Sequence, residues 1–371
     1  MRRQRIVVKI GSSSLTNEKG EIDQQKLDEH VRALVALKEA NHEVILVSSG
    51  AVAAGFRGLG YSSRPVTLKG KQAAAAIGQS MLIQTYIEKF SSFDIRVALL
   101  LLTRDDFSDR ERYRNVYATM TELLERGAIP IINENDTVSV EELTFGDNDM
   151  LSALVSGFIH ADQLIILTDI NGIYNGNPRT NPAAVKYDYL DGITEEMIQD
   201  TDSTGSKVGT GGMKSKLIAA KTATMLGVPV FIGHGKGHDK LIQVLQGNGD
   251  GTYIASHSKA PINMRKQWIA LHSEAMGRIY VDKGAEEAIS NQGSSLLSAG
   301  ILKISGTFEK GDVVHVYGMH DLLGKGEISC SSDELEQTIK SHSDREKVTP
   351  SIEVIHRDGW VSVEKIGEAL P

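Results

Sequence analysis

Short apolar runs alternate with longer segments of mixed polarity along the first part of the chain. The apolar runs are predicted strands, and they lie at residues 5–10, 43–49, 95–103, 129–134, 163–169 and 228–233. They are apolar almost without interruption, rather than at every second position. That pattern is typical of strands that are covered on both faces of a sheet.

The segments between these runs are longer, and in the first of them the apolar residues mostly follow helical spacing. Helices are predicted around residues 27–37 and at residues 70–90, 110–126, 148–161 and 213–226. Repeated alternation of strand and helix predicts an α/β fold, with a mostly parallel open sheet sandwiched by helices. Ligands of such sheets bind beyond the carboxyl ends of the strands. We therefore expect the functional residues directly after the predicted strands.

The alternation stops near residue 250. The stretch GNGDGTYIASHSKAPINMRK, residues 247–266, shows no clear period and is rich in Gly, Ser and Lys, and beyond it short β-like pieces are separated by closely spaced glycines. This pattern is typical of a small, mostly-β domain. We predict an α/β domain over residues 1–252, a linker over residues 253–275 and a mostly-β domain over residues 276–371.

Composition narrows the possible functions. The chain is 40% hydrophobic and carries a net charge of −8, which argues against a nucleic-acid surface along its whole length. Its single cysteine, Cys330, excludes an intrachain disulfide and a thiol metal cluster. No apolar window is long enough for a membrane span, and Lys9 interrupts the only apolar run near the N-terminus. A cytoplasmic location is expected.

Two strand ends near the N-terminus are rich in hydrogen-bond donors. The stretch VVKIGSSSLT ends a predicted strand with Lys9 and continues with Gly11 and Ser12, which would form a phosphate cradle at the sheet edge. An edge lysine that reaches out of an ordinary turn explains this stretch equally well. The stretch VSSGAVAAG carries Ser49 and Gly50 into a predicted helix, whose N-terminus favours anions or is simply capped by serine.

Polar residues gather in two turns in the middle of the chain. The stretches INENDTV and FGDNDMLSA contain Asn133, Asp136, Asn148 and Asp149. Amides and carboxylates can bind the ammonium and carboxylate groups of an amino acid, and some of these residues also suit turns and helix caps. Their number around one short segment favours a binding role.

Two later stretches suit a nucleotide. Thr168 and Asp169 follow a buried-type strand and precede a long Gly, Asn and Pro segment, in which we expect no regular structure. The stretch VGTGGMKSK combines a glycine turn with Lys214 and Lys216 at a predicted helix start. It is not a Walker loop, because the spacing G-x-x-x-x-G-K-[ST] is absent. His234 and His238 are separated by glycines, so we expect no metal site there.

The chemistry that these residues support is electrostatic. No Ser-His-Asp order and no cysteine nucleophile is evident in the motifs. Phosphoryl transfer to a carboxylate fits best, since a carboxylate needs no deprotonation at neutral pH. The protein then has to align the acceptor with the γ-phosphate and neutralise charge on the transferring group. Lys9 and Lys216, placed on either side of that group, would do so.

The stretches VVKIGSS, SSGA, INENDTV, GDND, LTDINGIY and GTGGMKSK occur in this order, and on them the chain resembles the amino acid kinase family over residues 5–250. The resemblance implies an enzyme that transfers the γ-phosphoryl group of ATP to the side-chain carboxylate of L-glutamate. The product would be L-glutamyl 5-phosphate, made in the first step of proline biosynthesis. The resemblance also implies Mg²⁺ bound with ATP, feedback inhibition by L-proline, and assembly into homodimers or tetramers.

The resemblance further implies roles for particular residues. Lys9 and Lys216 would bind the ATP phosphates and stabilise the transferring group, and Asp149 would hold both lysines. Glutamate would be bound by Ser49, Gly50, Asn133, Asp136 and Asn148. The ATP site would be lined by Lys9, Gly11, Ser12, Thr168, Asp169, Thr210, Gly211, Gly212, Met213, Lys214 and Lys216. We expect no metal ion held by protein side chains alone. Asn177 stands where the family pattern leads us to expect an acidic residue.

The C-terminal stretches GRIYVDKGAEEAI, GSSLLSAGI and FEKGDVVHV resemble a PUA domain, a type of domain associated with RNA. From Met276 onward, 10 Lys and Arg stand against 16 Asp and Glu, a net charge of −6 that disfavours RNA as a partner. Two alternatives remain open. The chain can be a sister kinase acting on aspartate or N-acetylglutamate, or an RNA-binding protein with a degenerate kinase core. The intact lysines and GDND argue against the second.

Overall fold

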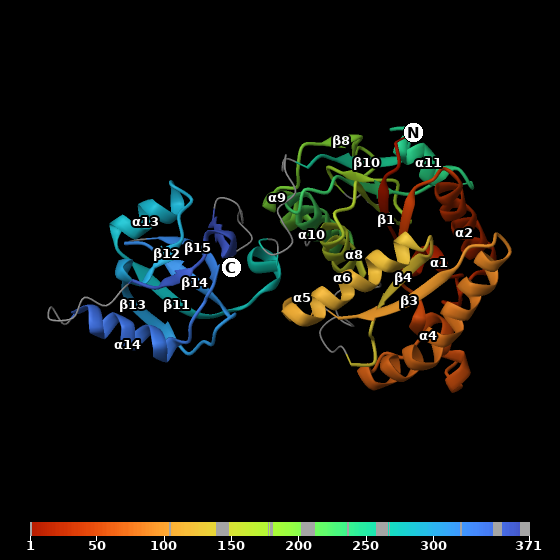
Figure 1. Ribbon diagram of the computed structural model, residues 1–371. Helices are drawn as coiled ribbons and strands as arrows, with labels where there is room; N and C mark the ends of the chain where they lie inside the picture. The colour runs from red at the N-terminus through yellow and green to blue at the C-terminus, as the bar shows by residue number, and fades with distance from the viewer. Residues whose placement is uncertain are drawn as a thin grey trace. The chain divides into compact units, whose positions relative to one another are not determined.

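The computed structural model separates into two compact units (Figure 1). One contains residues 1–104 and 114–261, and the other contains residues 105–113 and 262–371. The structure describes residues 2–103, 105–138, 148–176, 178, 181–201, 212–235, 237–256, 266, 268–319, 321–343 and 351–363. None of the helices in these ranges is both long and apolar enough to cross a membrane.

The first unit is built on an eight-stranded sheet with the order β3-β4-β2-β1-β5-β9-β10-β8. Its strands are β1 (Arg5–Ile10), β2 (Glu43–Ser48), β3 (Val97–Leu102), β4 (Ile129–Glu134), β5 (Gln163–Leu167), β8 (Tyr189–Leu190), β9 (Val230–Gly233) and β10 (Gly251–Ile254). All neighbours pair in parallel except β9 and β10. The predicted mostly parallel sheet is confirmed.

Helices cover both faces of this sheet (Figure 1). One face packs against α2 (Gln24–Glu39), α4 (Leu68–Ser91) and α11 (Lys240–Leu245), in a core that contains Ile6, Val8 and Ile10 of β1. The other face is covered by α8 (Asn148–Phe158) and α10 (Met213–Met225). Since side chains alternate along a strand, Lys9 points to the face of α8 and α10.

Shorter elements complete the first unit. They are α1 (Ser12–Leu15), α3 (Ala51–Gly55), η1 (Arg57–Leu59), β6 (Ile173–Tyr174), β7 (Lys186–Tyr187) and α9 (Glu195–Asp200). The helix α6 (Arg110–Glu125) also belongs to this unit, except for its first residues, which group with α5 (Asp105–Ser108) in the second unit. α3 and α4 touch backbone to backbone, because a Cβ atom on Gly78 would lie 1.8 Å from the carbonyl oxygen of Ala51. Only glycine permits that approach.

The second unit is mostly β, as predicted. Its five-stranded sheet has the order β13-β11-β14-β15-β17, with a core that includes Ile279, Val316 and Cys330. The elements are η3 (Trp268–His272), β11 (Ala275–Val281), α13 (Lys283–Ser290), β12 (Leu296–Leu297), η4 (Ser298–Gly300), β13 (Ile301–Gly306), β14 (Val313–Tyr317), β15 (Leu322–Glu327), α14 (Ser332–Ser343), β16 (Glu353–Ile355), η5 (Arg357–Gly359) and β17 (Trp360–Ser362).

Two local expectations about the first unit are wrong. β3 is an edge strand, and Leu99 and Leu101 are 36% and 38% exposed, so this run is not covered on both faces. The segment after β5 contains a short antiparallel β6–β7 ladder where we expected no regular structure. Apolar content alone does not distinguish a central strand from an edge strand that has an apolar outer face.

Candidate functional site

The ends of five strands bring the predicted motifs to one edge of the sheet. In the parallel register, Ile10 pairs with Ser48 on one side and with Leu167 on the other, and Leu167 pairs with Gly233. Val47 pairs with Ile132, so the residues after β2 and β4 are also neighbours. The segments that follow β1, β2, β4, β5 and β9 therefore lie side by side, as expected for a ligand site of a parallel sheet.

Two lysines that are far apart in the sequence meet at one carboxylate. Lys9 Nζ at the end of β1 lies 2.5 Å from Asp149 Oδ1, and Lys216 Nζ from α10 lies 3.1 Å from Asp149 Oδ2. Asp149 is in the first turn of α8, where the helix dipole favours a negative charge. Ser215 Oγ lies 2.8 Å from Asp149 Oδ2. The structure thus brings together the three residues predicted to be catalytic.

The trio is buried, and burial determines its electrostatics. Asp149 is 0% exposed, Lys9 4% and Lys216 6%. Burial lowers the pKa of Lys9, the attraction of Asp149 opposes that change, and the repulsion of Lys216 adds to it, so the pKa lies below the usual range. Burial alone would raise the pKa of Asp149, but the two ammonium groups outweigh it and keep that pKa low.

One carboxylate between two ammonium groups leaves the trio with a net formal charge of +1. A buried excess charge is costly unless a counter-charge is supplied. An anion with several oxygens, such as a phosphoryl group, would provide that counter-charge and accept hydrogen bonds from both lysines. The geometry of the trio therefore suits binding of a phosphate group.

The turn after β1 leaves room next to Lys9. A Cβ atom on Gly11 would lie 3.3 Å from Lys9 Nζ, so any side chain there would crowd the ammonium group. Ser12 begins α1 directly after Gly11 and is half-buried. The backbone and small side chains of this turn border the trio, where we predicted a phosphate cradle.

The residues predicted to bind glutamate lie along the ends of β2 and β4 and at the start of α8. Ser49 and Gly50 follow β2, and Gly50 has a φ of 115°, which disfavours any other residue. Asn133 is only 1% exposed, and its amide nitrogen donates to Gln79 Oε1 at 2.7 Å. Asp136 lies in the turn after β4 and is half-buried, and Asn148 starts α8.

The predicted nucleotide residues lie at the ends of β5 and β9 and at the start of α10. The backbone N–H of Thr168 donates to Gly233 O, and its hydroxyl donates to Asp169 Oδ1. Gly212 caps α10, Met213 begins that helix, and Lys214 is exposed. Thr210, Gly211 and Asn177 lie outside the described residues.

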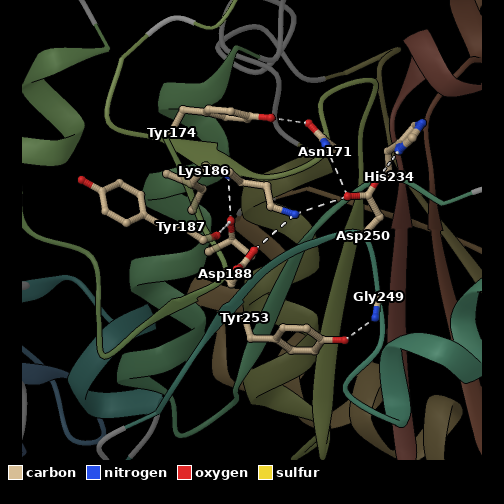
Figure 2. A network of polar contacts seen from close by, with 11 residues as sticks. Asn171, Tyr174, Lys186, Tyr187, Asp188, His234, Gly249, Asp250 and Tyr253 are labelled. Carbon is tan, nitrogen blue, oxygen red and sulfur yellow. Dashed lines mark hydrogen bonds and ion pairs between the residues drawn. The ribbon is translucent and has the colours of Figure 1, made fainter. Parts of the chain in front are cut away.

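Asp250 contacts three segments around the predicted nucleotide side, and it was not identified from the sequence. Asn171 Nδ2 and Lys186 Nζ each lie 3.3 Å from Asp250 Oδ1, and His234 Nδ1 lies 3.3 Å from Asp250 Oδ2 (Figure 2). These groups come from the loop after β5, from β7 and from the end of β9. A single aspartate in a Gly-rich turn carries no motif that would reveal such a role.

Two residues of α4 that lie beside the predicted glutamate residues were also not identified from the sequence. Gln79 and Tyr86 of α4 contact Asn133 and Ser48, at the ends of β4 and β2. Only their position on the buried face of a helix distinguishes them from other polar residues of α4. Which face of α4 is buried is known only from the packing in the structure.

Comparisons with known proteins fit this arrangement. Residues 4–234 match the amino acid kinase family, and residues 277–347 match the PUA domain. Glutamate 5-kinase 1 of Bacillus licheniformis is 64% identical over 98% of this chain and 100% of its own length. Glutamate 5-kinase of Oceanobacillus iheyensis is 62% identical over 99% of each chain. Carbamate kinase from Giardia lamblia bound to AMP-PNP shares the fold, with a TM-score of 0.51 at 15% identity over 69% of this chain and 99% of its own.

Proposed function

Because the chain belongs to the amino acid kinase family, we propose that it transfers the γ-phosphoryl group of ATP to the side-chain carboxylate of L-glutamate. The product is L-glutamyl 5-phosphate, which is made in the first step of proline biosynthesis. The observation that carries the proposal is the meeting of Lys9 and Lys216 at Asp149, beside strand ends that offer amides and hydroxyls.

In this proposal, the two lysines stabilise the phosphoryl group while it is transferred from ATP to glutamate. During transfer, negative charge spreads over the oxygens of that group, and placed cations lower the energy of the transition state. Asp149 holds the two ammonium groups a short distance apart, so they need no rearrangement when the reaction occurs. Their buried position strengthens this effect, because little water screens their charge.

The acceptor needs orientation more than activation. The glutamate side chain is already ionised at neutral pH, so no general base is required. We assign Ser49, Gly50, Asp136 and Asn148 to glutamate binding, because they surround the strand ends beside the trio. Asn133 is buried with its amide engaged, and we assign it to support of that site.

ATP would lie across the ends of β1, β5 and β9. Lys9, Gly11, Ser12 and Lys216 would border its phosphates, and Thr168, Asp169 and residues 210–214 would line the rest of the nucleotide. The single positive charge of the trio falls short of the charge on a triphosphate. Mg²⁺ bound to the phosphates fits this deficit and would supply further charge neutralisation. We place the reaction in the cytoplasm, where ATP is available.

Substrate identity can be tested directly by ATP consumption with a panel of acceptors. We expect turnover with L-glutamate and at least about 100-fold lower kcat/KM with L-aspartate or N-acetyl-L-glutamate, because a site that pairs each polar group of its substrate discriminates strongly. Hydroxylamine should trap the acyl phosphate as a hydroxamate. Preference for one of the other acceptors, or no ATP turnover, would contradict the proposal. Adding L-proline to the same assay tests feedback inhibition.

We also propose that the protein is a homo-oligomer whose copies meet through α4 and β3. Outward-facing apolar side chains gather there, with Ile77, Met81 and Ile87 of α4 39%, 50% and 43% exposed, beside Leu99 and Leu101 of β3. An edge strand flanked by an apolar helix face is normally covered.

Light scattering tests this assembly. Wild type should have the mass of a dimer or a larger oligomer, and Met81→Glu should shift it towards a monomer, because a charge in an apolar interface is costly. The control is Val185→Glu, the same kind of change at a 62% exposed residue outside α4 and β3. A wild type that is monomeric at micromolar concentration would rule out this face as a stable interface.

For the C-terminal unit, we propose a role in assembly or regulation. It is similar to a PUA domain, and residues 276–371 carry the net charge of −6. This charge works against RNA, whose backbone is bound mainly by Lys and Arg. We propose residues 1–252 as the catalytic domain and residues 276–371 as the PUA-like domain.

A further inference from the structure

α4 sends two polar side chains from its buried face to the strand ends that border the proposed glutamate site. Gln79 Oε1 accepts a hydrogen bond from Asn133 Nδ2 at 2.7 Å. Tyr86 Oη lies 2.9 Å from Ser48 Oγ, two turns farther along the helix. Neither residue belongs to a motif, and both contact residues that adjoin the acceptor side.

The contact with Gln79 fixes the orientation of the Asn133 amide. Asn133 Oδ1 accepts a hydrogen bond from the backbone N–H of Glu134 at 3.0 Å. A backbone N–H can only donate, so the oxygen of Asn133 must face it and the nitrogen must face Gln79. Since Asn133 is 1% exposed, water cannot replace a lost partner, and a buried donor without an acceptor is costly.

The same backbone N–H connects this contact to the phosphate side. It lies 3.3 Å from Asn148 Oδ1, so the Glu134 N–H is shared between Asn133 and Asn148. Asn148 precedes Asp149, the carboxylate that holds Lys9 and Lys216. A continuous polar chain therefore runs from Gln79 through β4 to the start of α8.

The contact of Tyr86 supports the neighbouring strand end. Ser48 Oγ also lies 3.1 Å from the carbonyl oxygen of Ser49, and Tyr86 is 0% exposed. Burial raises the pKa of the Tyr86 phenol, which therefore stays protonated and keeps its capacity to donate. α4 thus holds the ends of the neighbouring strands β2 and β4 through two separate contacts.

We propose that Gln79 is a positioning residue for the phosphoryl acceptor, acting through Asn133 on the Glu134–Asn148 contact. This inference rests on the proposed function. It adds a residue that determines how well the acceptor carboxylate is held. Gln79 reaches the glutamate side of the site, whereas the nucleotide side is held by other segments, among them those around Asp250. Its loss should therefore affect glutamate and leave ATP largely unaffected.

The test replaces Gln79 with methionine, which has a similar length and no amide. We expect the KM for L-glutamate to rise about tenfold, the range that follows from leaving one buried donor unpaired. The KM for ATP should stay within about twofold. Gln79→Asn, whose amide is one methylene too short for the contact, should give the same result. The matched control is Gln84→Met on the same helix, whose exposed amide contacts Glu88.

A double-mutant cycle separates positioning from general stability. If Gln79 acts through Asn133, Gln79→Met should change the KM for glutamate by less than about twofold in an Asn133→Leu background. Equal effects on the KM values of both substrates, no effect on either, or an equal effect of Gln84→Met would overturn the inference. A wild type that does not phosphorylate glutamate would overturn the proposed function itself, and this inference with it.

Discussion

Lys216→Met should lower kcat by about 1000-fold while the protein stays folded. In the proposed mechanism, the lysine contributes one of the two charges that stabilise the transferring phosphoryl group, and removal of one such group commonly costs that much. Methionine has nearly the same length, and its introduction leaves Lys9 and Asp149 as a neutral pair, so burial becomes no more costly. Lys9→Met should behave in the same way. The measurement is kcat from ATP consumption with saturating L-glutamate.

The control for this result is Lys221→Met on the same helix. Lys221 pairs with Glu195 and lies outside the trio, so its loss should change kcat by less than about threefold. Circular dichroism and the urea midpoint of each variant show whether the fold survives. Full activity of Lys9→Met or of Lys216→Met would remove the proposed mechanism.

Asp149→Asn should cost about 3–5 kcal/mol of stability at neutral pH, together with most of the activity. The change is isosteric, but it leaves two buried ammonium groups side by side without their shared counter-charge. Without the attraction of Asp149, the pKa of Lys9 should fall farther below that of the unfolded chain. Urea unfolding of wild type and variant measures the difference.

The pH dependence of this difference has a defined sign. Between the folded and unfolded pKa values of Lys9, the unfolded chain binds more protons, so stability rises with pH in that window. This pH range is wider in Asp149→Asn, because the folded pKa of Lys9 is expected to be lower there than in wild type. The difference in unfolding free energy between Asp149→Asn and wild type should therefore narrow as pH rises above neutrality towards the ordinary lysine pKa. A difference that stays constant or widens would show that lost packing, and not charge, destabilises the variant. The contribution of Asp149 itself is present above the ordinary aspartate pKa and is lost only as pH falls through its low folded value.

Much of the fold follows from local patterns. β1 and β4 have the predicted bounds, and α6, α8 and α10 begin at the predicted residues. β1 and β4 are short apolar runs, and the apolar residues of α6 and α8 gather on one helix face, so these signals do not depend on distant contacts. The meeting of Lys9 and Lys216 was predictable for a related reason, whereas the position of Asp149 between them was implied by the family resemblance. Lys9 lies at the end of a strand and Lys216 lies near the start of a helix, and parallel pairing brings such places to one edge of the sheet.

The features that sequence reasoning missed depend on which surfaces meet. The sequence of β3 predicts a strand buried on both faces, because a run of leucines does not show whether a helix covers the outer face. Gln79 looks like any polar residue of an alanine-rich helix, and only packing places it against Asn133. Asp250 acquires its three partners from segments far apart in sequence. Such properties become visible only in the assembled structure.

The alternation of side chains along β1 links folding to chemistry. If β1 shifted by a single residue against β2 and β5, the side chain of Lys9 would point into the apolar core beneath α2 and α4. A neighbouring aliphatic side chain of β1 would then lie beside Asp149. An ammonium group in that core would be prohibitively costly. The lysine that we propose for the reaction thus also favours correct strand alignment, and we expect a misaligned chain to be both unstable and inactive.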